Sequence, residues 1–250
     1  MKNIVIFLTE TLNLQPKTKN ALKLLINKLI KERGNKANLN DIDTSKISNM
    51  ERLFDNSDFD GDISNWDVSN VTNMSFMFSN SKFTGKNSNL NKWDVSNVTN
   101  MDSIFWKSDF DGDISKWDVS NVTNMDHMFY DSKFSGKNGD ISKWDVSNVT
   151  HMITMFSGSK FDGDLSKWDV GNVKNMSYMF WNSDFTGKNG DISQWNVINV
   201  KNMDHMFYGS KFNGNINKWN VNHVRIKDYM CSNCPLEKTP PTWYKRVKYK

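Results

Sequence analysis

The sequence predicts an α/β fold, a right-handed solenoid whose turns each contribute a short parallel strand and a short helical turn. Two observations carry this prediction. The motif WDVSNVTNM at 66–74 returns unchanged at 93–101 and 117–125, and with substitutions at 144–152, 168–176 and 195–203. Inside each copy the apolar spacing changes from alternate residues to i, i+3, i+4. This change of period is typical of a strand followed by a turn of helix.

The repeat length alternates between 24 and 27 residues. The motif tryptophans stand at 66, 93, 117, 144, 168, 195 and 219. The longer units carry a Gly-Lys-Asn insertion, as in FTGKNSNL at 83–90, where the shorter units have FDGDI, as at 59–63. A weaker first copy at 39–59 and a degenerate copy after Trp219 make eight units. Atypical terminal copies are expected of a stacked array, because its end faces must meet water.

Each unit predicts a strand and then a turn of helix. Trp66 and Val68 flank one polar residue, as in a strand that points two side chains inward. Met74, Met77 and Phe78 have the spacing of one helical turn with a single apolar stripe. One unit cannot bury this surface alone, so we expect equivalent Trp, Val, Met and Phe side chains to stack in core ladders. Asparagines recur in two columns, and we expect at least one of them to form a ladder that bonds the bends of successive units.

The chain divides into three predicted parts. Residues 1–38 contain an apolar run at 4–8, expected to be a strand, and a helical pattern over 16–34. That helix is expected to begin at Thr18, to end at Gly34 and to cap the first turn of the solenoid. Residues 39–234 form the solenoid, and 235–250 form a Pro-rich basic tail.

Charge and hydropathy exclude several classes of function. The net charge is +4, but the basic residues gather at the two ends and the body at 37–234 is mildly acidic. A nucleic-acid groove along the body is therefore not expected, because phosphate binding needs concentrated Lys and Arg. The apolar run of five residues near the N-terminus is too short for a membrane span or a usual secretory signal. We expect no membrane insertion.

Two motifs suggest metal chemistry without completing it. DFDGD at 58–62 and 109–113 alternates carboxylates as calcium loops do, but an Asp-Gly turn is the simpler interpretation. Cys231 and Cys234 form a single C-x-x-C; Cys231 takes a Phe position of the repeat, so we expect a buried thiol, with a redox pair or half of a zinc site as the alternatives. No catalytic set of nucleophile, base and acid emerges. We expect no enzymatic activity, no cofactor and no metal.

Candidate binding residues are those that stand out from the repeat or face outward beside its tryptophan. Large aromatic residues occupy positions on the predicted helical turn where other units have small or polar ones, and a protein or a glycan could bind them. Lys and Asp columns flank the buried Trp and could bind a protein through matched charges. The candidates are Trp106, Tyr130, Trp181, Tyr208, Phe76, Tyr178, Lys116, Asp118, Lys143, Asp145, Lys167 and Asp169.

The motifs resemble a known family. I-x-x-W-x-V is similar to the strand signature of leucine-rich repeats. The unit F-x-G-D-I-S-x-W-D-V-S-N-V-T-N-M-x-x-M-F closely resembles the repeats of BspA-like leucine-rich-repeat bacterial surface proteins over roughly 39–230. The resemblance implies a leucine-rich-repeat-like solenoid, an adhesion or binding role without known chemistry, and a cell-surface or secreted location. The sequence itself, without an evident signal peptide or anchor, predicts a cytoplasmic one.

These observations predict a non-enzymatic protein-interaction module. Adhesion or binding of a host or partner protein is the first hypothesis. An intracellular scaffold for another bacterial protein and a calcium- or glycan-binding module are the alternatives.

Overall fold

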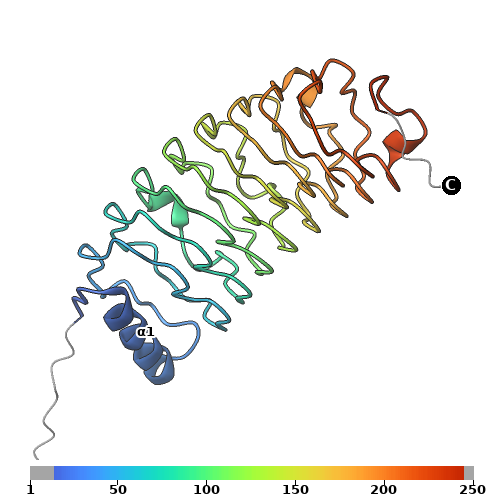
Figure 1. Ribbon diagram of the computed structural model, residues 1–250. Helices are drawn as coiled ribbons and strands as arrows, with labels where there is room; N and C mark the ends of the chain where they lie inside the picture. The colour runs from blue at the N-terminus through green and yellow to red at the C-terminus, as the bar shows by residue number, and fades with distance from the viewer. Residues whose placement is uncertain (1–13, 245–250) are drawn as a thin grey trace, which may run out of the picture.

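The computed structural model describes residues 14–244 and shows an elongated stack of coils with one α-helix at its N-terminal end (Figure 1). The predicted strand at 4–8 lies outside the described residues. Helix α1 spans Lys19–Arg33, and three 3-10 helices follow: η1 (Leu90–Lys92), η2 (Ile192–Gln194) and η3 (Pro235–Glu237). No helix within 14–244 combines the length and hydropathy needed to cross a membrane.

The predicted fold class is wrong. Between residues 14 and 244 there is no strand and no sheet; isolated parallel bridges join successive coils, from Asn49↔Asn73 to Asn202↔Ile226, and Asn38↔Asp62 adds one more at the N-terminal end. The expected helical turn is also absent from the described coils, because the residues after each Met form overlapping turns. Eight coils are linked by these bridges, and we number them from coil 1, which contains Asn49, to coil 8, which contains Ile226.

Bends between the apolar residues explain why no strand forms. After Trp66, the Asp67 carboxylate accepts a hydrogen bond from Ser69 N at 3.0 Å. The Val68 carbonyl then accepts from Val71 N at 2.9 Å, which closes a turn. The chain therefore changes direction within three residues of each tryptophan. Alternate apolar residues are spaced as in a strand, but no strand can extend through two consecutive bends.

Positive backbone angles explain why no helical turn forms. Phe76 has φ 55° and Asn80 has φ 48°, and the equivalent residues of the other coils are also left-handed. A right-handed helix requires negative φ at every residue. The segment is instead a series of turns, such as the one closed by Met77 N and Met74 O at 3.1 Å. Met74, Met77 and Phe78 still point inward together.

The predicted core ladders are confirmed. The repeated Trp, Val, Met and Phe side chains are buried in one continuous cluster that runs from α1 to the last coil. Phe78 stacks on Phe105 at a centroid distance of 5.6 Å, and Phe105 stacks on Phe129 at 5.8 Å. Each motif tryptophan also donates from its indole nitrogen to a carbonyl of the preceding coil, as Trp93 does to Ile63 O at 3.1 Å.

Asparagines bond successive coils, as predicted. Asn97 Nδ2 donates to Ser69 O at 2.8 Å, and Asn121 Nδ2 donates to Ser96 O at 2.7 Å, each reaching one coil back. The second asparagine column acts within its own coil, where Asn73 Oδ1 accepts from Ser75 N at 2.9 Å. Only the first column therefore links coils through its side chains, whereas the second column links them through the backbone bridges.

The alternation of 24 and 27 residues couples the coils in pairs. In the short loop, Asp111 accepts hydrogen bonds from Ser135 N at 2.8 Å and Ser135 Oγ at 2.9 Å, both in the long loop of the next coil. Asn138 of the same long loop donates to Asp111 Oδ2 at 2.9 Å. In the same way, Asp60 accepts a hydrogen bond from Thr84 N and Asp162 accepts one from Thr186 N, each in the long loop of the next coil. An Asp loop followed by a Gly-Lys-Asn loop is therefore one structural pair.

Backbone hydrogen bonds along one side of the stack all point the same way. We call this side the turn wall; it consists of residues 74–80 and their equivalents. In coil 1, Met50 N donates to Asn73 O at 2.9 Å and Phe54 N donates to Met77 O at 2.8 Å. Later coils repeat the pattern, always from an N–H of the earlier coil to a carbonyl of the later one. The peptide dipoles of the turn wall thus align along the stack, as they do in a helix.

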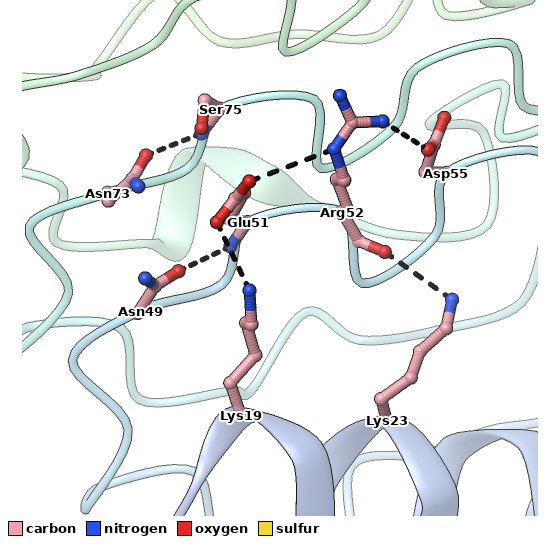
Figure 2. A network of polar contacts seen from close by, with 8 residues as sticks. All are labelled: Lys19, Lys23, Asn49, Glu51, Arg52, Asp55, Asn73 and Ser75. Atoms are coloured by element: carbon pink, nitrogen blue, oxygen red, sulfur yellow. Dashed lines mark hydrogen bonds and ion pairs between the residues drawn. The ribbon is translucent and has the colours of Figure 1, made fainter.

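Helix α1 covers the carbonyl end of the turn wall. Thr18 Oγ1 accepts from Ala21 N at 3.2 Å and begins the helix, which ends at Gly34, as the sequence predicts. Lys23 donates to the Leu53 carbonyl, the equivalent of Met77 O in a coil that no earlier coil precedes. Figure 2 shows Lys19 beside it, paired with Glu51 at 3.1 Å. Cations therefore meet the negative end of the aligned peptides.

The residues after Cys234 cover the opposite, N–H end. Glu237 Oε2 accepts from Asn233 N at 3.0 Å, and the hydroxyl of Tyr244 bonds the backbone of Cys231. Trp243 Nε1 donates to Ile216 O at 3.1 Å, the same bond that every motif tryptophan makes. The tail thus extends the tryptophan column by one position and places a carboxylate at the positive end of the turn wall.

A single substitution tests the aligned wall. We expect Lys23→Met to lower the free energy of unfolding by about 1–2 kcal/mol, because it removes a cation bonded to an otherwise unpaired carbonyl. Met and Lys have similar helix propensities, so α1 itself should be unaffected. Lys28→Met, on an exposed face of α1, is the control and should change little. Equal losses in both variants, measured by denaturant unfolding, would contradict the capping role.

Candidate interaction surface

Aromatic residues gather on the outer side of the turn wall. They occupy two columns. One is the first positive-φ position of each coil, which is Tyr178 in coil 6, and the other is the residue after the buried Phe. We call this set the aromatic surface; its members are Trp106, Tyr130, Tyr178, Trp181, His205, Tyr208 and Tyr229. All seven are partly exposed, whereas the ladder phenylalanines beside them are fully buried.

The first cluster joins coils 3 and 4. The rings of Trp106 and Tyr130 stack with centroids 5.9 Å apart and planes 14° from parallel. Lys107 covers them: its ammonium lies 4.6 Å from the Trp106 ring centre and 6.0 Å from that of Tyr130. The two predicted residues therefore lie together. A cation–π contact with Lys107 on the outer side holds their rings in place.

The second cluster spans coils 6 to 8. Tyr178 stacks on His205 with centroids 4.8 Å apart, and His205 lies 4.9 Å from Tyr229. Tyr208 packs against His205 at 5.3 Å. Trp181 follows Tyr178 on the same coil and stays partly exposed. The structure thus brings two of the predicted residues, Tyr178 and Tyr208, around His205, and it places Trp181 on the same wall without a ring contact to them.

Burial and a carboxylate shape the electrostatics of this second cluster. Partial burial raises the pKa of the Tyr178 phenol, and Asp204 raises it further through its charge and a hydrogen bond. Asp204 Oδ1 also lies 2.9 Å from His205 Nδ1. The Tyr178 hydroxyl is thus engaged with the Asp204 carboxylate, which also faces His205.

Sequence reasoning missed three members of these clusters. Lys107, His205 and Tyr229 were not among the predicted binding residues, although His205 and Tyr229 lie at the same repeat position as Tyr178. The indication available in the sequence was the 24/27 spacing itself, which assigns His205 and Tyr229 to the column of Tyr178. Phe76 also lies in that column, but Arg52 covers its ring at 4.0 Å, so it belongs to the N-terminal end.

The predicted Lys and Asp columns lie on a different side of the stack. Lys116, Lys143 and Lys167 are exposed just before the buried tryptophans. The carboxylates after those tryptophans serve the backbone: Asp118 accepts from Ser120 N and Asp145 from Ser147 N, each at 3.0 Å. Asp169 accepts from Gly171 N at 2.9 Å. These aspartates therefore form bends, and they are not brought together with the aromatic surface.

The Asp-Gly loops use their carboxylates to hold protein donors. Asp60, Asp111 and Asp162 each accept an N–H and a hydroxyl from the next coil. A calcium ion needs several free oxygen ligands at one point. No group of three or more potential ligands converges within residues 14–244. The described geometry thus gives these loops a structural part and offers no set of ligands for calcium.

The two cysteines are buried and unpaired. Cys231 takes the place of a ladder Phe and is 1% exposed, so the predicted burial of its thiol is confirmed. Burial raises the pKa of the Cys231 thiol to about 12, with smaller contributions from Cys234 and Glu237. Cys234 Sγ donates to Cys231 O at 3.1 Å. Metal binding and thiol exchange both need a thiolate, which this environment disfavours.

The aromatic surface offers apolar area with polar groups at its edges. Stacked rings that are already ordered lose little side-chain freedom when a partner covers them. The indole, phenol and imidazole groups add hydrogen-bonding atoms at the rim. Such a surface is suited to bind another macromolecule.

Comparison with known proteins places the chain among repeat proteins. A family model with the description "Mycoplasma protein of unknown function, DUF285" matches residues 25–139 and again 132–243. The two matches together cover all eight coils and the C-terminal part of α1. No curated protein and no solved structure matches the sequence.

Proposed function

The chain belongs to the family described as Mycoplasma protein of unknown function, DUF285, and we propose that it is a non-enzymatic module that binds a partner protein through the aromatic surface. The family match supports a repeat-type bacterial protein. The likeness of its motifs to BspA-like surface repeats supports adhesion to a host protein as the specific role.

One observation carries the proposal. Coils 3, 4, 6 and 7 have Trp or Tyr at a position where coils 2 and 5 have serine, and the fold tolerates both. Ser79 and Ser157 are buried at that position without any aromatic ring. The aromatic residues are therefore not required to stack the coils. Partly exposed Trp and Tyr side chains at the centre of a surface are the residue types that contribute most to protein binding.

Replacing the aromatic residues of the first cluster by serine tests the proposal. The intact protein, immobilised, should capture a partner from a host-cell surface extract, and Trp106→Ser with Tyr130→Ser should weaken that binding by tenfold or more, as expected for two central aromatic residues. The matched control is Lys86→Gln with Lys137→Gln, two exposed lysines of the Gly-Lys-Asn loops. Equal binding by the serine variant and the original would contradict the role of the first cluster.

The source of the captured protein separates adhesion from the scaffold alternative. Capture from the host-cell extract supports adhesion. Capture only from a bacterial lysate, with the same loss in the serine variant, would contradict adhesion while keeping the aromatic surface as the binding site.

A further inference from the structure

A column of cations appears in the last three coils at a position that is threonine in the coils before. The residue after the second motif Val is Thr72, Thr99, Thr123 and Thr150 in coils 2 to 5. It becomes Lys174, Lys201 and Arg225 in coils 6 to 8. We call these three residues the basic column. All three side chains are exposed.

The basic column is continuous along the stack. Lys201 N donates to Lys174 O at 2.8 Å, and Arg225 N donates to Lys201 O at 2.8 Å. The three residues are therefore direct neighbours in adjacent coils, about 4.8 Å apart along their backbones. None of the three is in an ion pair within residues 14–244. Three unpaired cations at this spacing repel one another.

The substitution removes a bond that stabilises the earlier coils. Thr99 Oγ1 donates to Thr72 O at 3.2 Å, and Thr150 Oγ1 donates to Thr123 O at 3.2 Å. Lys and Arg cannot make this local bond. The last three coils thus lose a hydrogen bond and gain repulsion, so the fold itself gives no reason for the cations.

Neighbouring acids disappear one coil after the basic column begins. The residue after the motif Trp is Asp in coils 2 to 6 but Asn196 and Asn220 in coils 7 and 8. The asparagines keep the bend, since Asn196 Oδ1 accepts from Ile198 N and Asn220 Oδ1 accepts from Asn222 N, each at 3.3 Å. The change leaves the backbone as it was and removes negative charge. Two independent columns therefore change together toward positive potential.

A shallow hollow of about 370 Å³ accompanies the basic column. It is lined by Thr150, Asn172, Lys174, Asn199 and Lys201. No aromatic side chain lines it, although single-stranded nucleic acids require rings for stacking. Neutral hydrogen-bonding groups alternate with the cations instead. That combination fits a hydroxyl-rich chain that also carries anionic groups.

We propose that the basic column binds a linear sulfated polysaccharide that runs along the stack across coils 6 to 8. Its sulfate groups pair with Lys174, Lys201 and Arg225. Its hydroxyl groups bond the asparagine and threonine side chains between them. The site lies apart from the aromatic surface and does not depend on the protein-binding role proposed for it.

The test measures binding of a heparin-derived dodecasaccharide to the full chain and to Lys174→Thr/Lys201→Thr/Arg225→Thr. Threonine is the residue of coils 2 to 5, so this variant should unfold no earlier than the original. We expect it to bind at least about tenfold more weakly. Binding by the original should also weaken by roughly tenfold when salt rises from ~50 to ~200 mM, because bound counterions are released. The control Lys86→Gln/Lys137→Gln/Lys188→Gln has the same charge change and should bind within about twofold of the original.

Three results would overturn the proposal. They are no binding by the original protein, an equal loss in the control variant, and tighter binding of a single-stranded oligonucleotide of the same charge, which would assign the site to nucleic acid. If the triple variant is less stable than the original, Lys201→Thr alone decides, with an expected loss of a few-fold against no loss for Lys137→Gln.

Discussion

Phe129→Ala is expected to lower the free energy of unfolding by about 4 kcal/mol, which corresponds to a fall in melting temperature of about 10 °C. Phe129 is 0% exposed. Its ring stacks on Phe105 at 5.8 Å, on Phe156 at 5.5 Å and on Phe134 at 4.2 Å. Removing it leaves a cavity between three coils that the neighbouring rings cannot fill, because each is held by its own ladder.

The adjacent residue is the control. Tyr130 follows Phe129 directly, yet it is partly exposed and occupies a position where Ser79 and Ser157 are tolerated. Tyr130→Ser should therefore cost less than about 1 kcal/mol. Thermal unfolding of both variants, side by side, gives the comparison. Similar losses in the two would contradict the division of the repeat into fixed core positions and variable surface positions.

Asp60→Ala is expected to lower the free energy of unfolding by about 2–3 kcal/mol. Asp60 is 6% exposed and accepts from Thr84 N and Thr84 Oγ1, each at 2.8 Å. Its carboxylate also forms an ion pair with the ammonium group of Lys36. Without the carboxylate, the Thr84 donors lose their partner and the long loop of the next coil loses its attachment. Asp58→Ala, two residues earlier and exposed, should change stability by less than about 0.5 kcal/mol.

The carboxylate of Asp60 also makes the stability of the protein depend on pH in the acid range. Burial of Asp60 would raise its pKa, but the bonds from Lys36 and Thr84 outweigh burial and hold the pKa below its usual value. A lowered folded-state pKa contributes stability above the unfolded value of ~3.9, and that stability is lost as pH falls through the folded value. Asp60→Ala should therefore lose less stability than the original protein between about pH 5 and pH 2. An identical acid profile in the two proteins would contradict this contribution.

Composition and spacing predicted the interior of this molecule well and its backbone poorly. The buried positions followed from the repeat because apolar side chains must be covered whatever path the backbone takes. Helix α1 followed from Thr18, its apolar stripe and Gly34. The path itself did not follow. Trp66 and Val68 alternate as in a strand, but the bond from Ser69 N to Asp67 bends the chain before a strand can form.

Left-handed turn residues are the largest single reason for the error in fold class. Phe76 and Tyr178 have φ 55° and 57°, a conformation that single-residue preferences reserve for Gly and Asn. They hold it because each donates its N–H to the next coil, as Phe76 does to Asp102 O at 2.9 Å. The sequence of one unit does not indicate this left-handed conformation, because the conformation is stabilised only when the coils stack.

The aromatic surface was predictable in part. Trp106, Tyr130, Trp181 and Tyr208 were identified because they break the repeat, and the structure places them partly exposed on one wall. Their partners Lys107 and Tyr229 were missed because these two residues stand out only through their distances to rings of neighbouring coils, which the sequence does not give. Trp243 was missed as a core position because prolines precede it and no motif surrounds it, although it lies 24 residues after Trp219.

The measurement that tests the central claim most directly combines folding and binding in one variant. Trp106, Tyr130, Trp181 and Tyr208 are all replaced by serine, the residue that other coils carry at this position. We expect a melting temperature within about 5 °C of the original and the loss of at least nine-tenths of the captured partner protein. A variant that remains folded and captures the partner as the original does would contradict the claim that the variable positions, and not the repeated motif, choose the partner.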